Sequence, residues 1–243
     1  MQRRLPPLLV VLVLAGCAHA QAGGVSSGFS IVEASPDPEA AAQVARVLPL
    51  AREKAERWGP LAAPVVVTIH PSGEDLASAT GRAGDAWLRG WARPGAVDVV
   101  APRGWTRGKA SDAALATLLA HELTHCALFQ RLGAGWARRD VPAWFEEGMA
   151  SYTAGEHHSR ADGAALRPRR GAGRIDPATA YGTADRAFRD LVERHGERAV
   201  GALLDGLGAG LPFDEAFLSA TGSSRARFEA ALRDRLAGAT AAR

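Results

Sequence analysis

The segment HELTH, residues 121 to 125, has two histidines four positions apart and a glutamate directly after the first histidine. On a helix, residues four apart lie on the same face, so the imidazoles of His121 and His125 can reach one metal ion from successive turns. Glu122 is rotated by about 100° from His121 around the axis, beside the metal, where its carboxylate can take a proton from a water that the metal activates. A catalytic zinc also needs a third protein ligand and an open position for water. Without that ligand, the alternative is a solvated helix face that carries two histidines.

The candidates for a third ligand are two adjacent carboxylates in WFEEGMASY, residues 144 to 152. Glu146 and Glu147 cannot both face one ion squarely, because neighbouring helix positions point about 100° apart. Residues 126 to 146 give enough chain for the first helix to end, turn near GAGW and lead into an antiparallel second helix. Gly148 favours Glu147 as the ligand, because a glycine at this junction would let the helix that carries HELTH pack closely.

In HELTH and WFEEGMA together, the chain resembles the gluzincin zinc metallopeptidases, the thermolysin-like and peptidase MA-like families. Their third ligand is a glutamate just before glycine on a later helix, in a W-[FL]-x-E-G-x-A segment. The resemblance therefore implies Glu147 as the ligand, with Glu146 solvated or behind the ligands, and one zinc ion per chain. The metzincin class is excluded, because Leu128 and Arg131 stand where that class has a glycine and a third histidine.

The same resemblance implies a residue that stabilises the oxyanion formed during hydrolysis. Tyr181 stands in a Y-x-x-[AS]-x-x-x-[FV] pattern, with Ala184 and Phe188 at the other two positions. The alternative for Tyr181 is a tyrosine that only packs at the start of a helix. No G-x-M-E-N segment, typical of the gluzincin aminopeptidases, precedes HELTH, which favours an endopeptidase.

Other residues near these motifs have structural interpretations. Tyr152 lies five residues after Glu147, off the face that would carry the ligand, and is expected to pack against the helix of HELTH. His157 and His158 lie in the polar segment AGEHHSRADG, which is expected to be a surface loop. The basic segment Arg167–Arg174 is also expected to be a solvated loop, and the alternative is that it contacts an acidic substrate or covers the cleft.

The elements that must position these residues follow from the spacing of apolar side chains. GFSIVEA and APVVVTIHP are typical of strands, and residues 87 to 102 predict a hairpin that turns at Pro94-Gly95. In gluzincins the edge strand that binds an extended peptide precedes the zinc helix, as this hairpin does. A helix is expected over residues 37 to 59, where Pro49 should kink or interrupt it. A second is expected over residues 111 to 132, with Ser111 or Asp112 as the cap. Most of the chain from Pro142 onward is also expected to be helical, with Gly196 as a stop.

This order predicts an α+β protein, in which a small N-terminal sheet with helices packs against a mostly helical C-terminal half, with the active-site cleft between them. We expect a signal peptide at 1–16, a lipidated flexible tether at 17–27 and a single metallopeptidase domain at 28–243. The domain would divide into an α/β lobe, 28–110, and a helical lobe, 111–243. The hydrophobic content of 47% is ordinary for a globular domain of this size.

The N-terminal residues predict export. Arg3 and Arg4 precede an apolar run from Leu5 to Gly16 that is too short to span a bilayer. The run ends in LAGC, which resembles the lipobox of bacterial lipoproteins, so Cys17 would be lipidated and would hold the protein in the cell envelope. Cleavage after AHA, residues 18 to 20, and release as a free protein is the alternative. The formal charge of +3 becomes about +1 once the two signal arginines are removed, and no basic stripe carries aromatics, which argues against nucleic acid.

The sequence thus predicts a monomeric, membrane-anchored zinc endopeptidase that cleaves a peptide or protein substrate, with Glu122 as general base. The alternative is a catalytically silent zinc-containing lipoprotein that acts as an envelope binding or assembly module. Glu122 argues against this alternative, because a structural zinc site has no use for a general base. Hydrolysis of another amide, such as a cell-wall bond, would use the same residues.

Overall fold

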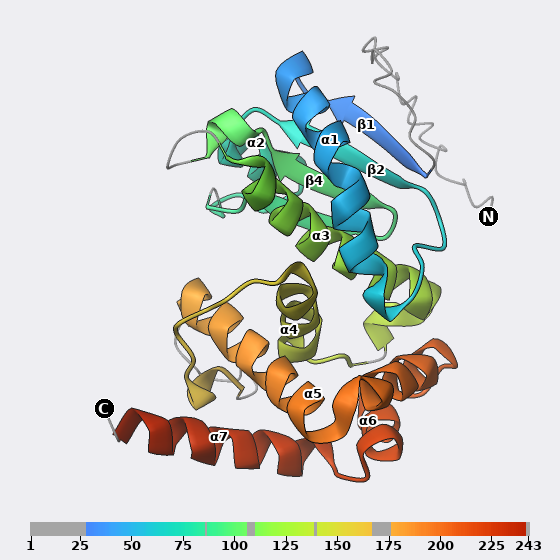
Figure 1. Ribbon diagram of the computed structural model, residues 1–243, viewed down its shortest axis with the longest axis vertical. Coiled ribbons are helices and arrows are strands. Elements are labelled where there is room, and N and C mark those ends of the chain that lie inside the picture. The colour runs from blue at the N-terminus through green and yellow to red at the C-terminus, as the bar shows by residue number, and fades with distance from the viewer. Residues whose placement is uncertain (1–27, 86, 106–109, 139, 167–175, 242–243) are drawn as a thin grey trace, which may run out of the picture.

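The computed structural model describes residues 28–85, 87–105, 110–138, 140–166 and 176–241 (Figure 1). The predicted signal peptide, the tether with Cys17 and the basic segment Arg167–Arg174 lie outside the described residues. The described chain is an α+β protein with a small sheet in its first half and helices throughout its second half, which confirms the predicted class.

The sheet has four strands among the described residues, in the order β1-β2-β4-β3. β1 (Phe29–Glu33), β2 (Val65–His70) and β4 (Ala96–Val100) are parallel, and β3 (Gly90–Arg93) is an antiparallel edge strand. The predicted hairpin is confirmed, since β3 and β4 are joined at Pro94-Gly95, where Gly95 has a φ of 76°. Both predicted strands before it are also confirmed.

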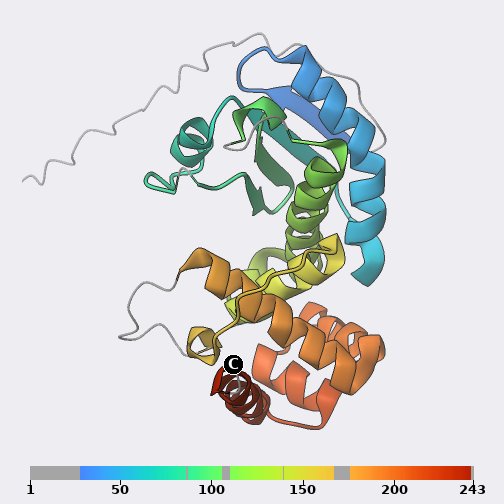
Figure 2. The same ribbon diagram turned by 60° about the vertical axis from the view of Figure 1, so that its left-hand side comes forward.

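Two long helices cover one face of the sheet (Figure 2). α1 (Pro38–Ala55) is capped by Asp37, whose carboxylate accepts from the backbone N–H of Ala40, and α3 (Asp112–Leu132) is capped by Ser111. Their apolar side chains form one core with Val65, Val67 and Ile69 of β2.

The prediction that Pro49 interrupts its helix is wrong, because α1 continues through it. An internal proline costs about 3 kcal/mol, since it removes one backbone hydrogen bond and crowds the preceding turn. Leu48 and Ala51 on either side of it are buried in the core with α3 and the sheet, whereas Pro49 is exposed. Tertiary burial of the flanking residues therefore outweighs the local preference.

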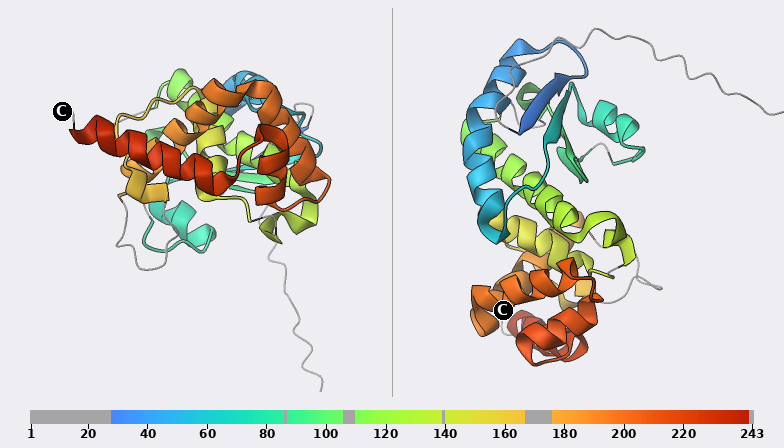
Figure 3. Two further views of the ribbon diagram at one scale, coloured as in Figure 1. Left: turned by 90° about the horizontal axis from the view of Figure 1, so that it is seen from below. Right: turned by 90° about the vertical axis from the view of Figure 1, so that its right-hand side faces the viewer.

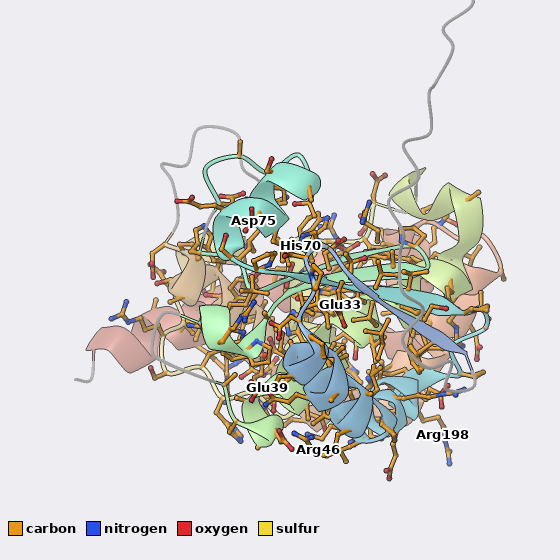
Figure 4. All side chains as sticks on the ribbon, turned by 90° about the horizontal axis from the view of Figure 1, so that it is seen from above. Glu33, Glu39, Arg46, His70, Asp75 and Arg198 are labelled. Carbon is orange, nitrogen blue, oxygen red and sulfur yellow. The ribbon has the colours of Figure 1, made fainter. Side chains whose placement is uncertain are left out.

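The opposite face of the sheet is partly covered by a short helix that the sequence did not predict. α2 (Gly73–Ala79) begins at Ser72, and its Leu76 packs with Leu88 and Val100. Beside this cluster, His70 Nε2 lies 2.8 Å from Asp98 Oδ1, and Arg93 donates to the other carboxylate oxygen at 2.5 Å. Figure 4 shows His70 beneath the α2 segment that carries Asp75. The buried pair of His70 and Asp98, with the exposed Arg93, links β2, β4 and β3 by side chains as well as by backbone.

Among the described residues after α3 there are four α-helices: α4 (Ala143–Ala154), α5 (Pro177–Gly208), α6 (Phe213–Thr221) and α7 (Arg225–Ala241). Figure 3 shows these helices gathered at the end of the molecule away from the sheet. They enclose a separate core that is rich in aromatic rings, among them Trp144, Phe145 and Phe188. Gly196 has a φ of 77° and breaks the helical geometry of α5, in agreement with the predicted stop. Among the described residues, no helix combines the length and the apolar character needed to cross a bilayer.

α3 belongs to both cores. Leu123 and Phe129 pack with the sheet and α1, whereas Leu128 and Leu132 pack with the C-terminal helices. The core thus divides along α3 itself, although the sequence grouped this helix with the helical lobe. Residues on the α3 face toward α4 consequently lie at the junction of the two halves.

Gly148 determines how closely α4 approaches α5. A Cβ atom at Gly148 would lie 2.3 Å from the carbonyl oxygen of Ala184 and 2.8 Å from Cβ of Phe188. The close packing expected at this glycine therefore exists, but its partner is α5 and not the helix of HELTH. The backbone contact leaves no room for even a methyl group.

We expect Gly148→Ala to lower the free energy of unfolding by about 1–3 kcal/mol or more, because the new methyl must push apart two backbones. The matched control is Gly201→Ala in α5, where an added Cβ meets no atom within 4 Å. That variant should be neutral or more stable by up to about 1 kcal/mol, because alanine favours a helix interior over glycine. Urea unfolding followed by circular dichroism measures both, and equal stability of the two variants would contradict the packing described.

Candidate metal centre

α3 directs both histidines of HELTH to one point. His121 and His125 are buried, and their Nε2 atoms lie 3.2 Å apart. The prediction that the segment is helical and presents the two imidazoles on one face is therefore confirmed. His125 also stacks on Phe129, one turn further along α3, with ring centroids 6.0 Å apart.

Glu147 of α4 completes a group of three donor atoms. Its Oε2 lies 3.4 Å from Nε2 of His121 and 3.5 Å from Nε2 of His125. The side chain as a whole keeps 34% of its exposure, but the Oε2 atom is buried and makes no hydrogen bond. Among the described residues, His121, His125 and Glu147 form the group that could hold a metal ion, and Glu146 does not belong to it.

The separations of the three donors fit a small tetrahedral ion. With bonds of about 2.0–2.2 Å, two ligands of a tetrahedral zinc are about 3.3–3.6 Å apart. The measured separations are 3.2, 3.4 and 3.5 Å. They exceed the roughly 2.7–2.9 Å of a charge-assisted hydrogen bond, so direct pairing does not account for the buried oxygen.

Charges in the centre are strongly coupled. Burial disfavours a charged imidazole at His121, but its contacts with the carboxylates of Glu147 and Glu156 outweigh burial and hold the pKa well above 6.5. For Glu147, burial is outweighed by the positive charge and contacts of His125 and His121, so its pKa lies well below the usual range. Burial raises the pKa of Glu146 to about 7, against a smaller lowering by His125.

Glu122 lies beside the donor group, between α3 and the edge strand. It is buried, and this burial raises the pKa of its carboxyl despite the nearby charges of His121 and His125. A Cβ atom at Gly90 of β3 would lie only 2.5 Å from Oε1 of Glu122. Gly90 therefore provides the space that the Glu122 carboxylate occupies, a role that strand periodicity did not indicate.

Tyr181, in the first turns of α5, lies close to the same centre. Its ring centroid is 6.1 Å from that of His121 and 6.2 Å from that of His158, on which it stacks. Burial, together with the carboxylates of Glu147 and Glu122, raises the pKa of the phenol. Tyr181 consequently stays protonated and can donate a hydrogen bond.

Two other expectations meet different outcomes. Tyr152 was expected against the helix of HELTH, but its ring contacts are with Trp58 and with Phe188 of α5. His157 is exposed in a loop, as expected. His158 lies in the same loop but is half-buried, with Nε2 3.1 Å from Oε2 of Glu156.

Glu156 is the site residue that sequence reasoning missed. Its Oε2 lies 3.3 Å from Nδ1 of His121, on the opposite edge of the ring from Glu147. Burial is outweighed by the contacts with His121 and His158, which keep the pKa of Glu156 well below the usual range. Nδ1 of His121 is itself buried and makes no hydrogen bond. No local pattern marks this glutamate, because it lies in the loop after α4 and reaches α3 only through the tertiary fold.

The raised pKa of His121 predicts opposite pH dependences with and without zinc. In the metal-free protein, the folded chain binds a proton at His121 more tightly than the unfolded chain does. This proton therefore stabilises the fold fully below pH 6.5, and the stabilisation is lost as pH rises through the higher pKa of the folded state. Glu146, with its pKa of about 7, acts in the same direction. In the metal-free protein, the free energy of unfolding should therefore rise as pH falls from about 8 to about 6.

In excess zinc, the free energy of unfolding should instead fall as pH falls over the same range, because protons compete with the ion for the imidazoles. Thermal unfolding in both conditions measures the slopes, and slopes of the same sign would disprove the prediction.

A second prediction concerns the choice between the adjacent glutamates. Wild-type protein should bind about one zinc per chain, and Glu147→Gln should lose more than the roughly 10- to 100-fold in affinity that removal of a group behind a ligand costs. Glu146→Gln is the matched control and should bind zinc within a few-fold of wild type. Competition with a chromophoric chelator measures the three dissociation constants. The reverse ranking of the two variants would move the ligand to Glu146.

Comparison of the chain with protein-family models and with curated protein sequences found no match. The resemblance to the gluzincins remains an expectation that rests on HELTH, on WFEEGMA and on Tyr181.

Proposed function

We propose that this chain is a zinc-dependent peptidase, of the endopeptidase type, in which His121, His125 and Glu147 hold one zinc ion. The observation that carries the proposal is the triangle of donor atoms, with sides of 3.2, 3.4 and 3.5 Å and a buried Oε2 that makes no hydrogen bond. Glu122 beside this triangle supports a catalytic role over a structural one. A purely structural site needs four protein ligands and no adjacent base, whereas a hydrolytic site needs three and a base.

Zinc in such a site polarises a carbonyl and makes a water molecule acidic near neutral pH. Glu122 would accept the proton of that water. Because burial raises its pKa, its carboxylate is a stronger base than an exposed glutamate and can pass the proton on to the leaving amine. The closeness of Gly90 limits where the carboxylate can move and would keep it beside the scissile bond.

Tyr181 would stabilise the negative charge that develops on the carbonyl oxygen. Its raised pKa keeps the phenolic O–H protonated, and its ring lies beside His121. A donor that is already in position costs no reorganisation when the charge appears. The ring contact of Tyr181 with His121 puts the tyrosine beside the donor group, which supports this role.

The substrate would be an extended peptide bound along β3. This strand ends the sheet on one side, so its outer backbone edge can pair with another strand, and it carries Gly90 next to Glu122. The cleft would lie between the sheet and the helices α4 and α5. The envelope location and the lipid at Cys17 remain predictions, because they depend on residues outside those described.

The test is digestion of a peptide library by wild type and by Glu122→Gln, with cleavage products identified by mass spectrometry. Glu122→Gln should keep its zinc and lose about 10²- to 10⁴-fold in rate, the usual contribution of a general base. Gly90→Ala should also keep zinc and lose activity, because the methyl displaces the carboxylate, whereas Gly201→Ala should cleave like wild type.

Undiminished cleavage by a metal-free preparation or by Glu122→Gln would refute the proposal. A wild type that binds zinc and forms no adduct with a hydroxamate probe would instead indicate the silent binding module. Cleavage restricted to cell-wall amides would keep the mechanism and change the substrate class.

A further inference from the structure

The loop after α4 brings a carboxylate to the rear edge of a candidate metal ligand. Oε2 of Glu156 lies 3.3 Å from Nδ1 of His121, while Nε2 of the same ring faces Glu147 and His125. The two nitrogens of an imidazole point away from each other, so Glu156 cannot join the donor group on the Nε2 side. Nδ1 of His121 is buried and makes no hydrogen bond, so Glu156 is the nearby acceptor toward which it can turn its proton. A proton on Nδ1 leaves the lone pair of Nε2 free for an ion.

We propose that Glu156 is the positioning residue for His121, which fixes the orientation and tautomer that metal binding requires. The proposal rests on the metal centre proposed above. Carboxylates behind ligating histidines raise the basicity of the imidazole and reduce the freedom of its ring. One turn after Glu147, α4 carries Ser151, whose Oγ lies 3.4 Å from Nε2 of His158.

Glu156 is itself held from several directions. Its backbone N–H donates to the carbonyl of Ser151 at 2.9 Å, directly after Gly155 ends α4 in the left-handed conformation. Arg189 of α5 donates to the carbonyl of Glu156 at 2.8 Å, and His158 Nε2 lies 3.1 Å from the same Oε2 that faces His121. The backbone of Glu156 is thus fixed by two hydrogen bonds, and its carboxylate lies between His158 and His121.

The loop that carries Glu156 is fixed onto α5 next to Tyr181. A Cβ atom at Gly182 would lie 1.5 Å from the carbonyl oxygen of Arg160, so the loop and the helix are in backbone contact there. The hydroxyl of Thr183 accepts from the N–H of Asp162 at 2.9 Å. The same contact therefore sets the position of Glu156 behind His121 and the position of Tyr181 beside it.

The experiment measures metal binding and does not depend on activity. Zinc dissociation constants are determined by chelator competition for full-length wild type, Glu156→Ala, Glu156→Gln and two controls, and the visible spectrum of each cobalt-loaded protein is recorded. His157→Ala changes the exposed neighbour in the same loop. Glu146→Gln removes a different carboxyl group near the centre. Because the pKa of Glu146 is about 7, the comparison is made at a pH well above 7, where this variant removes a negative charge that does not face His121 Nδ1.

We expect Glu156→Ala to bind zinc about 10- to 100-fold more weakly and to alter the cobalt spectrum. Glu156→Gln should recover part of this loss, because its amide oxygen can still accept the Nδ1 proton. Both controls should stay within a few-fold of wild type. Thermal unfolding of the metal-free variants shows whether a weaker zinc affinity results only from a less stable fold.

Glu156→Ala with wild-type affinity and an unchanged cobalt spectrum would overturn the proposal and leave the metal centre intact. Glu156→Ala could also bind zinc more weakly with an unchanged cobalt spectrum and an equal loss of metal-free stability. This result would overturn the proposal too, because the weaker binding would then follow from a less stable fold. A wild type that binds no zinc would overturn this proposal and the proposed function together.

Discussion

The contact between α3 and α4 is the constraint on which the rest of the site depends. It encloses two imidazoles and one carboxylate oxygen with separations of 3.2–3.5 Å, and that oxygen is buried without a hydrogen bond. Burying such groups is costly unless a proton or a cation compensates them. An ion bound there would join a helix from the sheet core to a helix from the aromatic core, so its binding free energy would also stabilise the packing of the two halves.

Small residues let the surrounding elements approach this contact. Gly148 brings α5 against α4, Gly182 brings the loop after α4 against α5, and Gly90 brings β3 against Glu122. At each of the three positions an added Cβ would lie within 2.5 Å of a neighbouring atom. Side chains at these three positions would separate the groups that the proposed chemistry requires. The glycines are therefore as necessary to the proposed site as its ligands are.

Local sequence signals predicted what local interactions determine. The cap at Ser111, the turn at Pro94-Gly95 and the helical face with His121 and His125 all depend on neighbours within a few positions, and each is found. The features that were missed depend on contacts distant in sequence. Burial against α3 and the sheet carries α1 through Pro49, α5 is the partner of Gly148, and the tertiary fold alone brings Glu156 to a histidine 35 positions earlier. The choice of Glu147 over Glu146 came from the family resemblance and from the packing expected at Gly148, although Gly148 in fact packs against α5. Adjacency on α4 alone would have left both glutamates open.

The excess of negative charge around the two histidines links the pKa values to the proposed metal. Glu122, Glu147 and Glu156 surround His121 and His125, and the contacts of His121 with Glu147 and Glu156 hold its pKa well above 6.5. A proton on His121 is one way to offset the carboxylates, and a divalent cation on Nε2 is a stronger one. These two alternatives exclude each other at the same nitrogen. The same negative charge that favours a proton on His121 would therefore favour a cation at the centre. The carboxylate of Glu156, on the far edge of the ring, favours both.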